Sequence, residues 1–552
     1  MRFSNKNLFI PIVLILITLP TLLPYFNSRF FYTQDYIFIA RLQQMSTALF
    51  SGQFPVRWAP DLRYGEPIFN FYAPLPYYIG AVIHLLGLNF IWVAKILFIL
   101  SALFSAITMY ILANKLFGQK AGVLAAVLYT YAPYKAVDMY VRGSLSETWA
   151  FIFFPLIFYC SLILVQQANF KNLSLLALSL AGLFLTHNVT TLMFLPFLVL
   201  WWIYLILKEK KWLSVVHLFL ASVLGFSLAA SFLLPAFFEN NLIQTKYLTV
   251  GYFNFRAHFV AYKQFFSLFW GYGSSLWGPN DGLSFQVGLV NFAILIVTAI
   301  LVIIKRKEKK YLGLFILLGM SLLVSLFLQH NKSAFIWEAI PLMAFIQFPW
   351  RFLGISIFLV SLMGGVMVFY LKNRLQFVYF ILIIAAIFST VSYFRPKEYT
   401  DDSFFDKFLQ PVIMHKGADL TKDYLPVWVK TVDDEGFDIP RAEKGEIKIA
   451  NLQQKSAVVD FTVNAISDST IELPITYFPG WEVRANNIVK LQSLPSNRGL
   501  IRFELTKGNY QMEVEFTDTP IRKIGNVISL CSIILTIALL IYEKRGKLKW
   551  VR

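Results

Sequence analysis

The stretch VISLCSIILTIALLIY, residues 527–542, carries no charged side chain, and neither does VNFAILIVTAILVII, residues 290–304. Of the 552 residues in the chain, 57% are hydrophobic and only 14% are charged. An apolar run of about 20 residues can cross a ~30 Å hydrocarbon core as a helix. A soluble core has no need of such runs, so the sequence predicts a mainly α-helical membrane protein with many spans.

The net charge of +18 would also fit a protein that binds nucleic acid. In a membrane protein, basic cytoplasmic loops and anionic lipid headgroups explain this charge better. The sequence therefore predicts a lipid bilayer, and no nucleic acid, as a partner. The two cysteines, Cys160 and Cys531, lie within apolar runs. We expect them to pack there rather than to form a disulfide or a metal site.

Twelve runs fit the length and hydropathy of a transmembrane helix. They cover residues 8–26, 90–113, 121–138, 147–166, 172–186, 189–207, 213–235, 285–304, 311–328, 351–371, 376–393 and 523–542. The first run follows a basic start, as a signal peptide would, but it is long and lacks a small-residue cleavage site. We therefore expect it to remain as a span.

The loop charges set the predicted orientation. With the N-terminus in the cytoplasm, the segments on the inner side carry 20 lysines and arginines and three glutamates, as the positive-inside rule requires. A further span at residues 74–89 would reverse everything after it, so we expect this run to lie along the outer face. The sequence predicts a multi-pass plasma-membrane protein with both termini in the cytoplasm.

Three long segments then lie outside the cell: residues 27–89, 236–284 and 394–522. From about residue 446 the third segment alternates apolar and polar residues, as in AVVDFTV, residues 457–463. This alternation is typical of half-buried strands.

The sequence therefore predicts three parts. Residues 1–393 form a transmembrane domain, residues 394–522 contain an extracytoplasmic β-sandwich domain, and residues 523–552 form a last helix with a basic tail.

Ionisable side chains gather on the predicted outer side. At the edge of a membrane such groups are costly and are therefore candidates for function. Fixed arginines suit phosphate recognition, and a carboxylate or histidine beside an acceptor can activate a hydroxyl. The candidates are Asp35, Arg41, Arg57, Arg63, Arg142, Glu147, His187, Asn188 and Arg351.

Asp35 is the first acid after the first apolar run, in FYTQDYIFIARLQQM, residues 31–45. It could simply cap a helix that begins at Tyr36, which would not exclude catalysis. Arg41 lies six residues further on, about 240° around a helix. The two side chains are therefore not expected to pair on one face, and Arg41 takes a supporting role.

The other candidates also have structural interpretations. Arg57 and Arg63 could be interfacial anchors whose charged ends reach water. Arg142 and Glu147 could form an ion pair at the start of a helix. His187 could be a hydrogen-bonded turn residue in a tight connection.

Several blocks of the sequence resemble a family of bacterial multi-span proteins labelled 6-pyruvoyl-tetrahydropterin synthase-related. The longest, from TQDYIFIARL to PLPYYIG, covers residues 33–80, and shorter ones are YVRGSLSETWAF, LTHNVTTLMFLP, IQFPWRFLG and KDYLPVW. This family is similar to the GT-C class of polyprenyl-phosphate-dependent glycosyltransferases. YFPGWEVRANN, residues 477–487, resembles a motif in the outer β-domain of YfhO-like membrane proteins.

The resemblance implies an inverting glycosyltransferase with a GT-C-like helical domain. The donor would be a polyprenyl-phosphate-linked sugar, and the acceptor a glycan, lipid or protein outside the cytoplasm. Asp35 matches the acid that acts as base in GT-C enzymes. The cations that would hold the donor phosphate are Arg142, His187 and Arg351, with Arg57 and Arg63 behind them.

The resemblance also implies supporting roles for Glu147 and Asn188. A second acid, which some metal-dependent members carry, is absent, because Tyr36 and Ile37 follow Asp35. No cofactor is therefore expected, and no divalent metal is expected to be required.

Two other functions fit the same spans. A flippase or exporter of lipid-linked glycans would need ionisable residues along the middle of its spans, and few occur there, Lys95 among them. A non-catalytic scaffold for envelope assembly would bind through the outer domain. Since the polar residues gather on one face, the sequence favours an enzyme or a receptor over a conduit.

Overall fold

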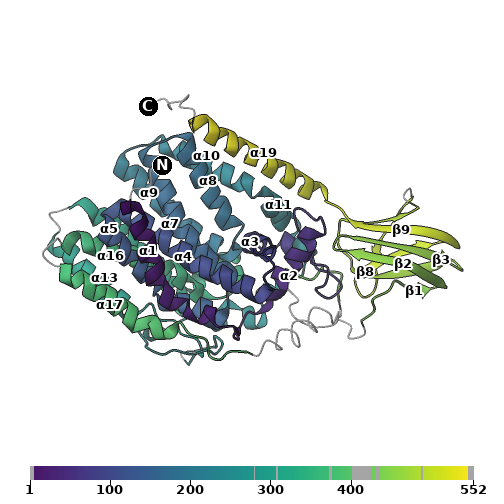
Figure 1. The fold of residues 1–552 in the computed structure, drawn as a ribbon, viewed down its shortest axis with the longest axis horizontal. Coiled ribbons are helices and arrows are strands. Elements are labelled where there is room, and N and C mark those ends of the chain that lie inside the picture. The colour runs from purple at the N-terminus through teal and green to yellow at the C-terminus, as the bar shows by residue number, and fades with distance from the viewer. Residues whose placement is uncertain are drawn as a thin grey trace.

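The computed structural model describes residues 5–278, 280–305, 309–371, 376–400, 424–430, 436–486 and 489–544. A body of helices occupies one end of the molecule and a β-domain the other (Figure 1). The last helix, α19 (Pro520–Lys544), runs from the β-domain back along the helical body (Figure 1). The predicted combination of a mainly helical protein with a C-terminal β-rich region is confirmed.

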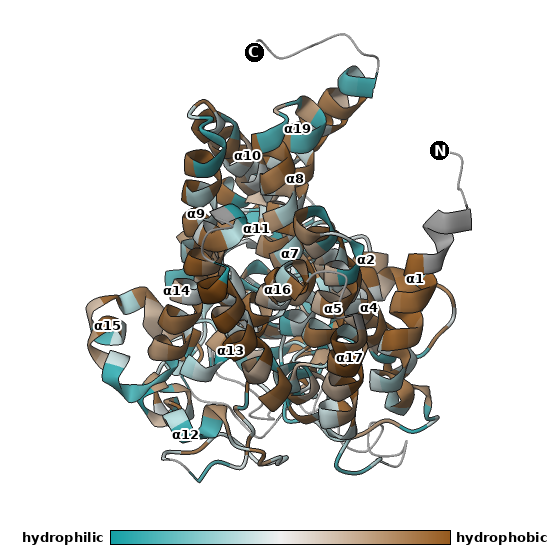
Figure 2. Ribbon diagram, turned by 90° about the vertical axis from the view of Figure 1, so that its left-hand side faces the viewer, coloured by the Kyte–Doolittle hydropathy of each residue, from teal (hydrophilic) through white to brown (hydrophobic). Residues whose placement is uncertain are grey.

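Six helices in the described part of the chain are long and apolar enough to cross a membrane. They are α4 (Phe90–Phe117), α7 (Leu145–Gln166), α9 (Asn188–Glu209), α14 (Leu312–Gln329), the stretch Pro349–Leu371 that contains α16 (Leu353–Leu371), and α19. Shorter apolar helices cover Ile10–Thr21, Phe170–Phe184, Leu289–Ile304 and Phe377–Tyr393. Hydrophobic residues dominate these helices (Figure 2). The count of twelve spans and the orientation stay predictions.

The predicted span 121–138 is not one helix. α5 (Gln119–Thr130) ends, α6 (Pro133–Ala136) restarts the helix, and a π-helical turn follows at Val137–Arg142. Pro133 explains the break, because proline has no N–H to bond to the preceding turn and disfavours helical backbone at Ala132. All residues from 133 to 142 are buried, so polar side chains of this segment are carried into the interior.

The predicted span 213–235 is bent by 77° between α10 (Ser214–Leu228) and α11 (Ala230–Phe238). Ser529 of α19 is inserted into the helical ladder there. Its hydroxyl accepts from Ser231 N–H at 2.8 Å and donates to Ser227 O at 3.2 Å. A side chain that replaces a backbone bond in this way is a recognised cause of a kink.

The helices pack around α16, which contacts α5, α13 (Leu289–Ile304) and α14. α16 is buried along almost its whole length. It therefore lies in the core of the bundle, as expected of a helix that is apolar on all its faces. α4 packs against α5 and α7 on the next layer. α19 is mostly exposed and apolar, as expected of a helix that faces lipid.

Two antiparallel sheets form the β-domain. One has the order β1 (Arg441–Lys444), β4 (Ser469–Thr476), β8 (Leu500–Leu505), β7 (Leu494–Pro495), and the other β2 (Ile447–Lys455), β3 (Val458–Ala465), β9 (Gly508–Phe516), β5 (Trp481–Ala485), β6 (Val489–Leu491). In β3, Val459, Phe461 and Val463 are buried while Asp460 is exposed, which is the alternation that the sequence showed. The strands begin at Arg441, slightly before residue 446.

A largely buried group of charged residues, in which Asp518 is 28% exposed, joins the β-domain and α19 to the helical body. We call it the junction cluster: Arg57, Glu239, Asp518 and Arg522, with the amides Asn70 and Asn526. Arg57 Nε lies 2.9 Å from Asp518 Oδ1, and Arg522 Nε donates to Glu239 Oε2 at 2.9 Å. Arg57 also donates to Asn70 Oδ1 at 3.0 Å and to Asn526 Oδ1 at 2.7 Å. Every charge in this cluster has an opposite charge beside it.

Candidate active site

Asp35 lies just before α2 (Ile37–Phe50), whose N-cap is Tyr36. The capping interpretation therefore holds only in part, since the Asp35 carboxylate faces the N–H of Ile37 without being the N-cap residue. The residue is partly exposed. Its backbone N–H donates to Arg142 O at 2.7 Å, so the first loop and the end of the π-helical turn lie side by side.

Gly143 permits this close approach. Its φ is +70°, which L side chains rarely adopt, and a Cβ there would lie 2.8 Å from Asp35 O. A second backbone bond, from Gln34 N–H to Val141 O at 2.9 Å, fixes the same register. The acid and the turn that carries Arg142 are thus held together by backbone rather than by side chains.

Glu147, in the first turn of α7, gathers cations and a hydroxyl. Arg142 Nη1 lies 2.8 Å from Glu147 Oε2, and Arg351 Nε lies 3.7 Å from the same oxygen. Tyr134 donates to Glu147 Oε1 at 2.6 Å, and Arg142 also pairs with Asp138. The side chains of Arg142 and Arg351 keep 9% and 11% exposure, so both remain at the edge of the accessible space.

Two aromatic rings contact the guanidinium groups of these arginines. The guanidinium of Arg142 lies 4.6 Å from the ring centre of Trp350, and that of Arg351 lies 4.8 Å from the ring centre of Phe348. The two rings stack with centroids 4.9 Å apart. Trp350 Nε1 donates to Ser275 Oγ at 3.1 Å. Cation–π contacts and fixed rings together orient both cations.

The backbone just before these rings is strained. Gln347 has a φ of +65°, and Phe348 N–H donates to Ile346 O at 2.7 Å across it, which makes a γ-turn. Such a conformation costs on the order of 1–3 kcal/mol in a non-glycine residue. The side chain compensates, because Gln347 Nε2 donates to Leu248 O at 3.0 Å and Oε1 accepts from Arg351 at 3.1 Å.

His187 lies between α8 (Phe170–Phe184) and α9, buried, with Nδ1 2.6 Å from Thr190 Oγ1. Burial lowers its pKa to about 3, although Glu147 opposes the shift. The imidazole is therefore neutral at physiological pH and could serve a phosphate only as a hydrogen-bond partner. Asn188 donates to Phe71 O at 2.9 Å, which ties the start of α9 to the first loop.

Arg41 of α2 is buried beside Asp35, with its guanidinium carbon 4.2 Å from the ring centre of Tyr72. As expected from their spacing, no ion pair joins Asp35 and Arg41 in the described structure. Burial raises the pKa of Asp35 above its usual value, while the charges of Arg41, Arg142 and Arg351 act in the opposite direction. The carboxylate of Asp35 is thus influenced by the charges of three arginines.

Arg57 and Arg63 have other partners. Arg57 belongs to the junction cluster, and Arg63 Nε lies 3.9 Å from Glu66. Both are buried rather than placed at an interface, which differs from the anchoring interpretation. Their predicted part in phosphate binding finds no geometric support.

The sequence did not single out Tyr134, Asp138, Tyr72 or Trp350 as site residues. Asp138 and Arg142 are four residues apart, a spacing that brings side chains together on one helical face, and this was the available signal. The contacts of Tyr134 depend on the helix break at Pro133, and those of Trp350 depend on the γ-turn at Gln347. No local sequence pattern predicts these contacts.

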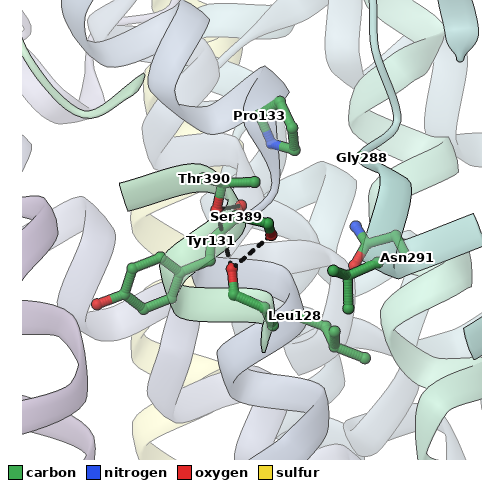
Figure 3. A pocket seen from close by; sticks show the side chains of 9 residues that line it. Leu128, Tyr131, Pro133, Gly288, Asn291, Ser389 and Thr390 are labelled. Carbon is green, nitrogen blue, oxygen red and sulfur yellow. Dashed lines mark hydrogen bonds between the residues drawn. The ribbon is translucent and has the colours of Figure 1, made fainter. Parts of the chain in front are cut away.

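A small pocket between α5, α13 and α17 (Gln376–Thr390) is separate from these charges. Its lining includes Leu128, Pro133 and Asn291, and Thr390 there donates to Tyr131 O at 2.7 Å (Figure 3). It holds no acid or base. Among the residues that the structure describes, no three or more His, Cys, Asp and Glu side chains are grouped to hold a metal ion.

Comparisons with known proteins match a large part of the helical body. The family model described as a 6-pyruvoyl-tetrahydropterin synthase related domain of a membrane protein matches residues 69–396. An uncharacterised protein of Lactococcus lactis subsp. cremoris is 28% identical over 246 residues, which cover 42% of this chain and 40% of that protein. The chain therefore matches less than half the length of this relative.

Three solved structures are similar at low identity. The mycobacterial arabinofuranosyltransferase AftD has a TM-score of 0.46 and 14% identity, over 76% of this chain and 29% of its own. The oligosaccharyltransferase of Archaeoglobus fulgidus has a TM-score of 0.42 and 13% identity, over 72% and 54%. ArnT from Cupriavidus metallidurans, bound to undecaprenyl phosphate, has a TM-score of 0.36 and 15% identity, over 69% and 64%.

Proposed function

We propose that this chain, which belongs to the 6-pyruvoyl-tetrahydropterin synthase-related family of membrane proteins, transfers a sugar from a polyprenyl-phosphate donor to an acceptor outside the cytoplasm. The acceptor would be a glycan, a lipid or a protein of the cell envelope. Asp35 would act as general base, and Arg142 and Arg351 would provide the positive charge that faces the donor phosphate.

One observation carries the proposal: Asp35 is a partly exposed acid whose charge is influenced by three arginines. A base must accept a proton near neutral pH, and a carboxyl whose pKa is raised by burial does so better than an ordinary one. A phosphate that leaves with a negative charge needs fixed cations close by. The site offers both within one group of side chains.

The reaction would proceed in one displacement. The acceptor hydroxyl oxygen attacks C1 of the sugar, and Asp35 takes the hydroxyl proton. The bond between C1 and the phosphate oxygen breaks, and the lipid phosphate keeps the electron pair. Neutral His187 would hydrogen-bond this phosphate, and Glu147 would keep Arg142 and Arg351 in place.

A transfer assay tests the proposal. The purified protein in lipid nanodiscs is given radiolabelled polyprenyl-phosphate-linked sugars and an envelope fraction as acceptor. We expect label to move to the acceptor, and Asp35→Asn to reduce the rate by about 10²–10⁴-fold. Asp61→Asn is the matched control, because Asp61 is an exposed acid of the same loop. Transfer by Asp35→Asn at the rate of the control would refute the role of Asp35.

A further inference from the structure

Within the part of the chain that the structure describes, Arg41 is the one arginine of the site whose guanidinium makes no hydrogen bond or ion pair. It is only 5% exposed, and its Nε is fully buried without a hydrogen bond. Its guanidinium carbon lies 4.2 Å from the ring centre of Tyr72. A buried guanidinium normally fills its five donors.

The other two arginines are already engaged. Arg142 pairs with both Asp138 and Glu147. Arg351 donates to Ile346 O at 2.8 Å and to Gln347 Oε1, and lies near Glu147. Its Nε, like that of Arg41, makes no hydrogen bond in the described structure, but its Nη1 makes both of those hydrogen bonds. An anion that approached these two would have to compete with carboxylates that are already present. Arg41 makes no ion pair among the described residues, so an anion there would break none, although it would meet the charge of Asp35.

The surroundings of Arg41 suit an oxyanion. Tyr72, Tyr77 and Tyr424 all lie close enough to influence its charge, and tyrosine hydroxyls can donate to phosphate oxygens. Tyr72 and Asp35, on either side of this charge, are both partly exposed. The planar fork of arginine matches two phosphate oxygens at once.

We propose that Arg41 is a phosphate-binding residue of the site and that its donors are filled by the oxyanion of a bound ligand. This deepens the proposed function, on which it rests, by assigning the direct phosphate contact to a residue that the sequence placed only in a supporting role. The phosphate belongs either to the lipid carrier or to a water-soluble phosphorylated compound, and binding experiments distinguish the two.

The experiment measures binding of two probes to the full-length protein in phosphatidylcholine nanodiscs: undecaprenyl phosphate and inorganic phosphate. We expect Arg41→Gln to weaken binding about 10–100-fold, since a charged hydrogen-bonded pair is lost. Arg41→Lys keeps the charge but lacks the planar guanidinium, so its affinity for the probes should lie between those of the wild type and Arg41→Gln. The control is Arg256→Gln, which removes an arginine that is 52% exposed and pairs with Glu338.

The two probes identify the source of the phosphate. Weaker binding of undecaprenyl phosphate alone indicates the lipid headgroup, and weaker binding of inorganic phosphate alone indicates a soluble compound. Weaker binding of both indicates that the phosphate group itself is recognised. Unchanged binding of both probes by Arg41→Gln overturns the proposal.

A stability measurement separates binding from a structural role. Without ligand, Arg41→Gln removes an unpartnered charge, so its unfolding temperature should equal or exceed that of the wild type. A marked drop in this temperature, with affinity unchanged, would mean that Arg41 only supports the fold. If Arg41-dependent binding is found but no donor sugar is transferred, the proposed function fails while this inference stands.

Discussion

Two buried groups of charged residues meet the first loop, and they differ in how their charges are matched. In the junction cluster, Arg57 faces Asp518 and Arg522 faces Glu239, at 2.9 Å in each case. Around Asp35, Arg142 and Arg351 share Glu147, while Arg41 has no ion-pair partner among the described residues. Matched charges hold elements together, whereas a charge in a protein interior that lacks a counter-charge is costly.

The largest expected effect on stability lies in the junction cluster. Glu239→Gln leaves Arg522, which is fully buried, without a counter-charge. Breaking a buried pair from one side typically costs about 3–5 kcal/mol, so the free energy of unfolding should fall by about that amount. Denaturant unfolding of the purified protein measures it.

The control for this prediction is Glu338→Gln, which breaks the exposed pair with Arg256 at 2.9 Å. Exposed pairs contribute about 0–1 kcal/mol, so this variant should unfold almost as the wild type does. If both variants lose the same stability, the junction cluster is not what joins the β-domain to the helical body.

Glu147→Gln tests the contrast between matched and unmatched charges, because it removes the carboxylate between two arginines and leaves room for another anion. It leaves Arg142 and Arg351 without their shared carboxylate, so we expect a loss of about 2–4 kcal/mol. Inorganic phosphate should restore part of this stability, and more in the variant than in the wild type. Thermal unfolding with and without phosphate measures the difference; an equal phosphate effect in both proteins would mean that anions do not reach these arginines.

The pH dependence of transfer should report on Asp35. Burial raises the pKa of Asp35 above its usual value. As the pH falls, Asp35 therefore becomes protonated, and transfer declines, at a higher pH than it would with an ordinary aspartate as the base. The transfer rate should reach its maximum above the folded-state pKa of Asp35 and should be lost as the pH falls through that pKa. His187, with a pKa lowered to about 3, should not contribute. An acidic limb that disappears in His187→Gln would contradict this assignment.

The smallest expected effect concerns the support of Arg142. Trp350→Phe keeps an aromatic ring beneath the guanidinium but removes the N–H that bonds Ser275 Oγ at 3.1 Å. One such bond contributes about 0.5–1.5 kcal/mol, so transfer should fall only a few-fold. Trp350→Ala removes the ring as well and should fall further; equal rates for the two variants would show that the ring does not orient Arg142.

Local patterns were enough to predict the broad fold. Charge-free runs such as residues 527–542 indicate membrane helices, and the alternation around Phe461 indicates strands. Interruptions of the helices were harder to foresee. The bend at residue 229 depends on Ser529, 298 residues from its partner Ser231, and no pattern near residue 229 announces it.

Of the pairings in the candidate site, the sequence offered the ion pair of Arg142 and Glu147, which the structure contains at 2.8 Å, but not the partners of the other arginines. Asp35, Arg142 and Arg351 come together from three separate connections, as expected of polar residues on one face. The partner of Arg57, however, is Asp518, 461 residues away, so the sequence could not tell a junction arginine from a site arginine. Arg41 was given only a supporting role because its spacing on a helix shows that it does not pair with Asp35, and says nothing about its other neighbours.

The central claim is that Asp35 acts on the acceptor and not on the binding of the lipid phosphate. Asp35→Asn removes a negative charge beside three arginines, so binding of undecaprenyl phosphate should be kept or become tighter while sugar transfer is lost. Parallel measurement of binding and of single-turnover transfer on this variant gives the test. Transfer that survives, or binding that is lost together with transfer, would contradict the account.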